Sequence, residues 1–188
     1  CSQLPVFAAE ETAQATDTAA QPQTADPSVV TTNGIDGWPQ ASDISSTAAI
    51  VMETSTNTVL YSKNVDQALY PASAVKVMTC LVALENSSLD DQVTMTATGV
   101  SGVTDGGANI SSQLDEVFTM EQCLYAIMVA SANDIALQVA EHVGGSVDAF
   151  VQTMNTRAQE LGCTNTVFTN PTGLPDENQH ITAHDMAL

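Results

Sequence analysis

The fold is decided by the stretch Tyr70-Pro71-Ala72-Ser73-Ala74-Val75-Lys76-Val77-Met78-Thr79-Cys80-Leu81-Val82-Ala83-Leu84. From Ser73 onward it is apolar nearly all round, which predicts a buried central helix that runs to about Glu85. Pro71 lies near the predicted first turn, where its missing N–H costs little. Lys76 is the only charge between Ser73 and Leu84. Burial should therefore desolvate its amine and lower its pKa.

The spacing of Ser73 and Lys76 favours serine acyl-transfer chemistry. Residues three apart lie on one helix face, so the Lys76 amine can reach the Ser73 hydroxyl. The first turn also offers free N–H groups and a positive dipole end to a developing oxyanion. We therefore predict Ser73 as nucleophile and Lys76 as its base. The alternative is a lysine that reaches from a core helix to solvent.

A second polar element, Ser131-Ala132-Asn133, lies at a predicted break between two apolar helices. Ser131 and Asn133 would cap those helices, and the same hydroxyl and carboxamide suit proton relay and amide recognition. Around these two elements, hydrophobic patterns and turn residues predict a hairpin at 48–61, a strand at 93–96, a loop at 99–112, and helices at 119–130, 133–144 and 146–161.

Charge and cysteine content exclude several functions. The chain of 188 residues has 22 acidic side chains and three basic ones, which gives a net charge of -19. This charge disfavours binding to nucleic acid and electrostatic binding to anionic membranes. We expect Lys63 to be solvated and Arg157 to pair with a surface acid. The four cysteines have no CxxC spacing and no His cluster, so a zinc site is not expected. Cys80, Cys123 and Cys163 lie among apolar residues and are expected to be small buried thiols.

The N-terminal residues indicate export. Pro5-Val6-Phe7-Ala8-Ala9 has small residues spaced as in a signal-peptidase site, so residues 1–9 are interpreted as the tail of a signal peptide. In the alternative, Cys1 is the lipid-bearing first residue of a lipoprotein. Residues 10–36 are rich in Ala, Thr, Gln, Asp and Pro, which predicts a disordered linker before a globular part at 37–188.

Three motifs in order resemble the bacterial D-alanyl-D-alanine carboxypeptidases, the low-molecular-mass serine penicillin-binding proteins. The first two motifs are Tyr70 to Thr79 and Ser131 to Asp134, and the third is Leu161 to Asp176. The Ser-x-x-Lys signature belongs to the wider penicillin-binding and β-lactamase group. The resemblance implies an α/β (α+β) fold of the β-lactamase/DD-peptidase type, an antiparallel sheet flanked by helices.

The resemblance also implies roles for four residues. Ser73 would be acylated by the penultimate D-Ala of a peptidoglycan stem peptide ending in D-Ala-D-Ala, and Lys76 would take its proton. Ser131 would pass a proton to the leaving D-Ala, and Asn133 would hold the substrate amide. β-Lactam antibiotics would be covalent inhibitors, and no metal or organic cofactor is implied.

Two departures from the family pattern limit this expectation. The family's Lys-Thr-Gly motif is absent, so residues 37–188 are expected to be an incomplete, inactive N-terminal part of the catalytic domain, and a membrane anchor beyond Leu188 stays open. His184 stands where Tyr is commoner, and both His180 and His184 are interpreted as structural or rim residues, not as a base. Ser73 with His180 is a weaker pair because no acid partner is evident.

Two rival functions remain. A serine β-lactamase shares the fold and the Ser-x-x-Lys helix, although such enzymes typically have Asp at the position of Ala132. A non-catalytic wall-binding or sensor protein could also keep the fold. Fast turnover of penicillin would favour the β-lactamase over the carboxypeptidase. A Lys-Thr-Gly motif downstream in the gene would favour an enzyme, and its absence from the full gene would favour the non-catalytic protein.

Overall fold

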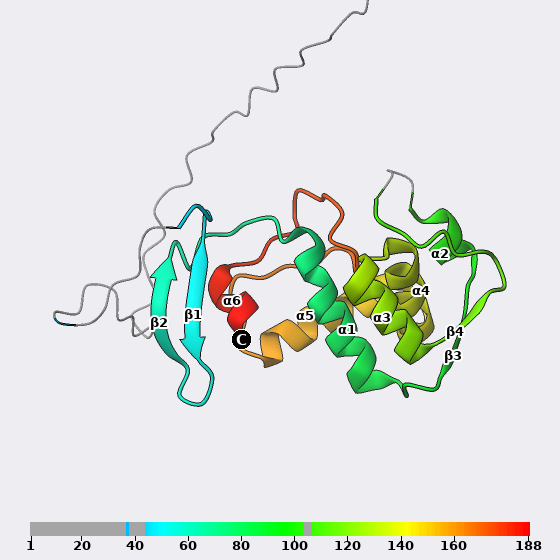
Figure 1. Ribbon diagram of the computed structural model, residues 1–188, viewed down its shortest axis with the longest axis horizontal. Coiled ribbons are helices and arrows are strands. Elements are labelled where there is room, and N and C mark those ends of the chain that lie inside the picture. The colour runs from blue at the N-terminus through cyan, green and yellow to red at the C-terminus, as the bar shows by residue number, and fades with distance from the viewer. Residues whose placement is uncertain (1–36, 38–43, 104–106) are drawn as a thin grey trace, which may run out of the picture.

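The computed structural model describes residues 37, 44–103 and 107–188, so the predicted signal-peptide tail and linker lie outside the described residues. Figure 1 shows a helical body with a hairpin on one side. The elements in chain order are β1 (Ala49–Glu53), β2 (Thr58–Lys63), the 3-10 turn η1 (Ala72–Ala74), α1 (Val75–Asn86), β3 (Gln92–Thr94), α2 (Ala97–Ser101), β4 (Val117–Thr119), α3 (Met120–Ala130), α4 (Asn133–Gly144), α5 (Val147–Glu160) and α6 (Ala183–Ala187).

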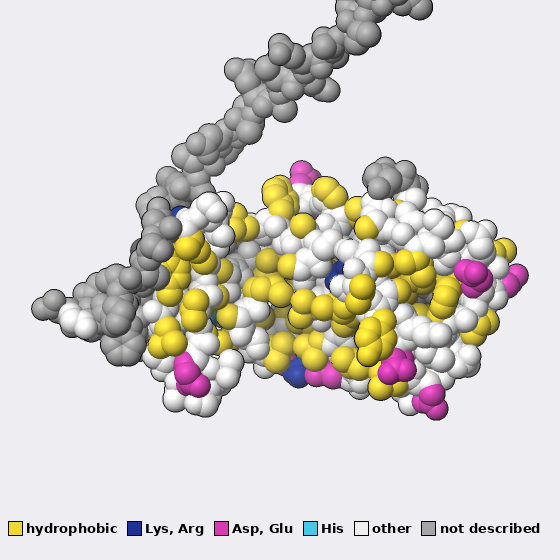
Figure 2. Space-filling model, viewed as in Figure 1, with side chains coloured by type: hydrophobic (Ala, Val, Ile, Leu, Met, Phe, Trp, Pro, Cys, Tyr) yellow, Lys and Arg dark blue, Asp and Glu magenta, His cyan; other side chains and the backbone are white. Residues whose placement is uncertain are grey.

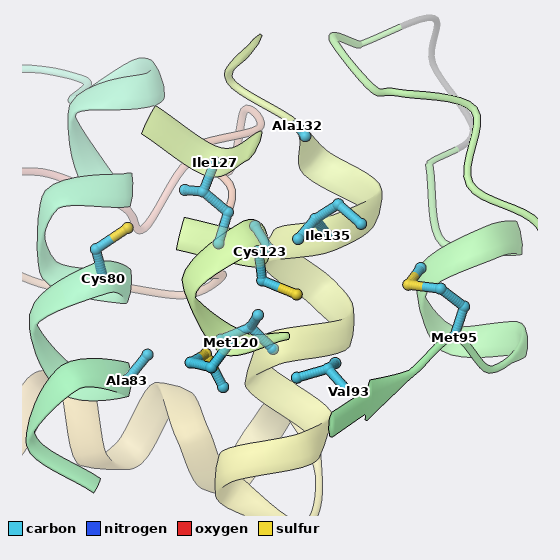
Figure 3. Close-up of a cluster of buried hydrophobic side chains, with 11 residues drawn as sticks. Cys80, Ala83, Val93, Met95, Met120, Cys123, Ile127, Ala132 and Ile135 are labelled. Atoms are coloured by element: carbon cyan, nitrogen blue, oxygen red, sulfur yellow. The ribbon is translucent and has the colours of Figure 1, made fainter. Parts of the chain in front are cut away.

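The core is built around α4, which packs against α1, α2, α3 and α5. One buried cluster joins α1, α3 and α4 to the β3 segment, and Figure 3 shows its side chains pointing toward one another from these elements. A second cluster joins α1, α4 and α5 through Phe150 and Met154, both fully buried. Because α1 contributes to both clusters, its first turn is held in a fixed place.

The strands form two small antiparallel sheets. β1 pairs with β2 as the predicted hairpin, with an irregularity between Val51 and Met52, and α6 packs near β1. β3 pairs with β4, a strand that the sequence did not predict. The mixture of helices with small antiparallel sheets agrees with the predicted α/β (α+β) class.

Local signals place the helix ends where they were predicted. Thr119 caps α3 and forms a capping box with Gln122. Ser146 caps α5 by accepting from the backbone N–H of Ala149. α3 and α4 are separated by a break at Ser131 and Ala132. Ser131 is the C-cap of α3, in a left-handed conformation, as predicted. The predicted cap at Asn133 is wrong, because Ala132 is the N-cap of α4 and Asn133 is its first helical residue.

Three further predictions need correction. The α1 helix is not buried on all sides, because Val77 and Leu84 are 47% and 52% exposed. The predicted loop at 99–112 is wrong at its start, because its first three residues belong to α2 (Ala97–Ser101). Thr96 caps this helix, and Glu141 accepts hydrogen bonds from both Thr96 and Thr98. Lys63 is half-buried and its Nζ donates to the Ile44 carbonyl.

The exposed side of α1 borders a groove of about 410 Å³ between α1, the end of α5 and α6. In the space-filling view, hydrophobic side chains gather over α1 and α3 on the face turned to the reader (Figure 2). Within residues 44–103 and 107–188, no helix combines the length and hydropathy that a membrane span requires.

Candidate active site

Ser73 lies in the 3-10 turn that leads into α1, and its side chain is exposed. Lys76 is in the first turn of α1 and is only 3% exposed. Its Nζ lies 3.3 Å from Ser73 Oγ. The predicted contact between the amine and the hydroxyl is therefore present, and the alternative of a lysine extended into solvent is wrong.

The Lys76 amine is held from a second side. Its Nζ donates to the Thr172 carbonyl oxygen at 2.5 Å, a contact that spans 96 residues of sequence. Burial lowers the pKa of Lys76, and the nearby Cys80 opposes this shift. An amine with a lowered pKa has a larger neutral fraction, and only the neutral form can accept a proton.

Ser131 stands beside the same hydroxyl. Its left-handed backbone, with φ of 54°, turns the chain between α3 and α4. From this corner its Oγ donates to Ser73 Oγ at 3.0 Å. Ser73, Lys76 and Ser131 thus form one hydrogen-bonded group from three separate turns of the chain.

Asn133 is the first residue of α4 and is 4% exposed. Its backbone N–H donates to the Ala108 carbonyl at 2.8 Å. Among the described residues, its Oδ1 is a buried side-chain atom that has no hydrogen-bond partner. An unpaired buried acceptor costs about 1–3 kcal/mol, so it is a natural place for a ligand N–H.

The sequence reasoning missed the part played by the turn at Thr172 and Gly173. A Cβ on Gly173 would lie 1.9 Å from the Ala72 oxygen and 3.0 Å from the Ser73 nitrogen, and Gly173 has φ of 81°. Glycine is therefore required where this turn presses against the Ser73 turn. The Pro171-Thr172-Gly173 turn signal was available in the sequence, but nothing in it indicated contact with Lys76.

The remaining predicted residues lie elsewhere. His180 Nδ1 is 3.1 Å from the Asn178 carbonyl, and His184 Nδ1 is 3.9 Å from Asp185. Arg157 pairs with Glu85 through its Nε and Nη2 atoms, as predicted.

The cysteine prediction holds for two residues. Cys80 and Cys123 are buried free thiols, and burial raises their pKa values to about 11 and about 12. Cys163 is also free but only half-buried. In the part of the chain that is described, His, Cys, Asp and Glu side chains form no group of three or more that could hold a metal ion.

Comparisons with known proteins agree on one family. The family described as D-alanyl-D-alanine carboxypeptidase matches residues 36–188. The chain is 38% identical over 146 residues to D-alanyl-D-alanine carboxypeptidase DacF of Bacillus subtilis, covering 75% of this chain and 37% of the relative. It is 33% identical to a D-alanyl-D-alanine endopeptidase of Pseudomonas aeruginosa, covering 80% and 48%.

A solved structure, penicillin binding protein 5 from Haemophilus influenzae, matches with a TM-score of 0.74 at 31% identity, covering 79% of this chain and 45% of that one. This likeness agrees with the predicted DD-peptidase type of fold. The chain spans less than half the length of these relatives.

Proposed function

Since this chain belongs to the family of D-alanyl-D-alanine carboxypeptidases, we propose that it forms part of an enzyme that removes the terminal D-alanine from peptidoglycan stem peptides through an acyl-enzyme on Ser73. The observation that carries this proposal is the buried Lys76 amine, 3.3 Å from the exposed Ser73 hydroxyl. A serine hydroxyl is a weak nucleophile unless an adjacent base accepts its proton.

In the acylation step, Ser73 Oγ attacks the carbonyl carbon of the penultimate D-alanine while neutral Lys76 accepts the hydroxyl proton. The tetrahedral oxyanion forms near the Ser73 N–H, at the start of the helical segment, where the helix dipole favours negative charge. Collapse of this intermediate breaks the peptide bond. An ester between Ser73 and the shortened peptide remains.

Ser131 and Asn133 complete the proposed site. Ser131 Oγ lies 3.0 Å from Ser73 Oγ, so it can pass a proton from Lys76 to the leaving D-alanine nitrogen. The Asn133 Oδ1, which lacks a partner among the described residues, can accept from an amide N–H of the substrate. Water then hydrolyses the ester, and Ser73 is restored.

We propose the wider context from the same family membership. Residues 37–188 would be the N-terminal part of the catalytic domain, and β-lactams would acylate Ser73 because their strained amide resembles the substrate. Peptidoglycan lies outside the cytoplasm, so the protein would be exported to the cell wall or the outer face of the membrane.

The test uses fluorescent penicillin and the full-length protein that the gene encodes. Wild type should be labelled, and Ser73→Ala should not be labelled. The matched control is Ser87→Ala, because Ser87 lies at the far end of α1 and its Oγ donates to the Ala83 carbonyl. Labelling that survives Ser73→Ala would remove Ser73 as the nucleophile.

Product analysis separates the reactions catalysed by such proteins. A carboxypeptidase releases free D-alanine from a peptide ending in D-Ala-D-Ala, whereas an endopeptidase cleaves cross-linked peptides and releases none from this substrate. A serine β-lactamase would free itself from penicillin rapidly. Rapid penicillin turnover, or cleavage of cross-links alone, would contradict the proposed carboxypeptidase activity.

A further inference from the structure

The carboxamide of Asn170, a half-buried residue, holds the turn that follows it. Its Oδ1 accepts from the Thr172 N–H at 3.2 Å, the Thr172 hydroxyl at 2.9 Å and the Gly173 N–H at 2.8 Å. Its Nδ2 donates to the Leu174 carbonyl at 3.0 Å. One side chain therefore fixes the backbone on both sides of Thr172.

This turn contacts both members of the proposed nucleophile and base pair. The Thr172 carbonyl accepts from Lys76 Nζ at 2.5 Å. Gly173 packs so closely on the Ser73 turn that a Cβ there would lie 3.0 Å from the Ser73 nitrogen. A shift of the turn would change the surroundings of the amine and of the hydroxyl together.

The direction of the Lys76 amine matters for proton transfer. A neutral amine has two N–H donors and one lone pair, and only the lone pair can accept the Ser73 proton. An N–H donated to the Thr172 carbonyl fixes the orientation of the amine and leaves the lone pair available for Ser73 Oγ. If the Thr172 carbonyl moved away, the amine could rotate or admit water.

We propose that Asn170 is a positioning residue for the acylation step, acting through the Thr172 carbonyl on the Lys76 amine. This inference rests on the proposed function of Ser73 and Lys76. Within the described part of the chain, the Asn170 side chain forms no hydrogen bond with the Ser73 or Lys76 side chain. Its effect would therefore pass through the backbone of the turn that it holds.

No charged neighbour of Lys76 among the described residues sets its orientation, so we attribute that orientation to the hydrogen bond with the Thr172 carbonyl. Cys80, one turn further along α1, is the titratable group that acts on Lys76, and burial raises the pKa of its thiol to about 11. Cys80 is therefore neutral at the pH of the assay. On the side of the turn, the partner of the amine is the neutral Thr172 carbonyl.

The experiment compares Asn170→Ala with Asn155→Ala in the full-length protein. Asn155 is a matched control because it is also half-buried and also holds backbone, at Phe168, through its Oδ1 at 2.9 Å and its Nδ2 at 2.8 Å. The measurements are the rate of acylation by fluorescent penicillin as a function of pH, and the melting temperature.

We expect Asn170→Ala to slow acylation about 100-fold, as misplacement of a catalytic group by about 1 Å does. Water that reaches Lys76 should also raise its pKa, so the acidic limb of the pH profile should move to higher pH. Asn155→Ala should lower the melting temperature while its acidic limb stays where wild type has it. A purely structural role for Asn170 would lower stability without moving the limb.

Thr172→Val gives a milder version of the same change, because it keeps the shape of the side chain. It removes one donor to Asn170 Oδ1 and the acceptor of the Leu174 N–H, but leaves the Asn170 carboxamide in place. It should shift the acidic limb of the pH profile in the same direction by a smaller amount. If Asn170→Ala does not fold, Thr172→Val tests whether the turn positions the Lys76 amine. An unmoved limb with a wild-type rate in the folded variant would overturn the inference. Absence of labelling in wild type would instead overturn the proposed function.

Discussion

Replacing Lys76 by methionine should abolish most of the acylation and leave the fold intact. Methionine matches the buried aliphatic stem of Lys76, which is 3% exposed, and removes only the amine. Two contacts disappear with it, the 3.3 Å approach to Ser73 Oγ and the hydrogen bond to the Thr172 carbonyl. Loss of the amine removes the base for Ser73, which affects catalysis. It also leaves the Thr172 carbonyl without its Lys76 partner, which affects stability.

The size of the catalytic effect follows from the loss of the base. A positioned general base contributes about 10²–10⁴-fold, or about 3–6 kcal/mol at about 1.4 kcal/mol for each factor of ten. The stability terms oppose each other. An unpaired Thr172 carbonyl costs about 1–3 kcal/mol, whereas the removal of a desolvated amine is favourable.

The pH dependence of stability separates these terms. Burial lowers the pKa of Lys76 in the folded state below its usual value of 10.5. As the pH falls below about 10.5, the unfolded chain therefore binds a proton that the folded chain does not, and wild type loses stability until the folded-state pKa is reached. The Lys76→Met variant should lack this slope.

The assay is stopped-flow acylation by fluorescent penicillin in the full-length protein, with unfolding free energies measured between neutral pH and about pH 10.5. Lys63→Met is the control, because Lys63 is a half-buried lysine on β2 whose Nζ also donates to a backbone carbonyl, that of Ile44. Acylation of Lys76→Met within about threefold of wild type would refute the base assignment, since a positioned base contributes far more.

Three other predictions concern single contacts. Ser131→Ala should slow acylation at least about 100-fold at an unchanged melting temperature, because its hydroxyl lies 3.0 Å from the nucleophile, and rapid-quench kinetics would measure this. Gly173→Ala should lower the free energy of unfolding, measured by denaturant titration, by about 2–4 kcal/mol, because its Cβ would meet the Ala72 oxygen. Gly145→Ala is the control: Gly145 also has a positive φ, of 73°, but a Cβ there would meet open space, so the cost should be only about 1 kcal/mol. Cys123, whose pKa burial raises to about 12, should resist Ellman's reagent until the protein unfolds.

Much of the local structure was predictable because its signals are local. The capping box at Thr119 and Gln122 and the serine cap at Ser146 each depend on residues within four positions of one another. The spacing of Ser73 and Lys76 also predicted their contact, since both lie in consecutive turns at the start of one helix. Burial of Lys76 followed from its apolar neighbours in sequence.

Other features depend on segments that are far apart in the sequence. No residue near Val117 in the sequence indicates that Val117 pairs with Thr94, so the sequence did not predict strand β4. The exposed side of α1 was missed as well, because an all-apolar helix does not reveal which face lacks a packing partner. The position of Ser131, 58 residues from Ser73, is decided by how α3 and α4 pack on α1.

The sequence by itself determined that a serine and a lysine share one helix face, because a helix repeats every 3.6 residues whatever surrounds it. Only the tertiary structure decided how that lysine is oriented. Its second partner, the Thr172 carbonyl, comes from a turn 96 residues away, and a backbone carbonyl leaves no mark in the sequence because every residue has one.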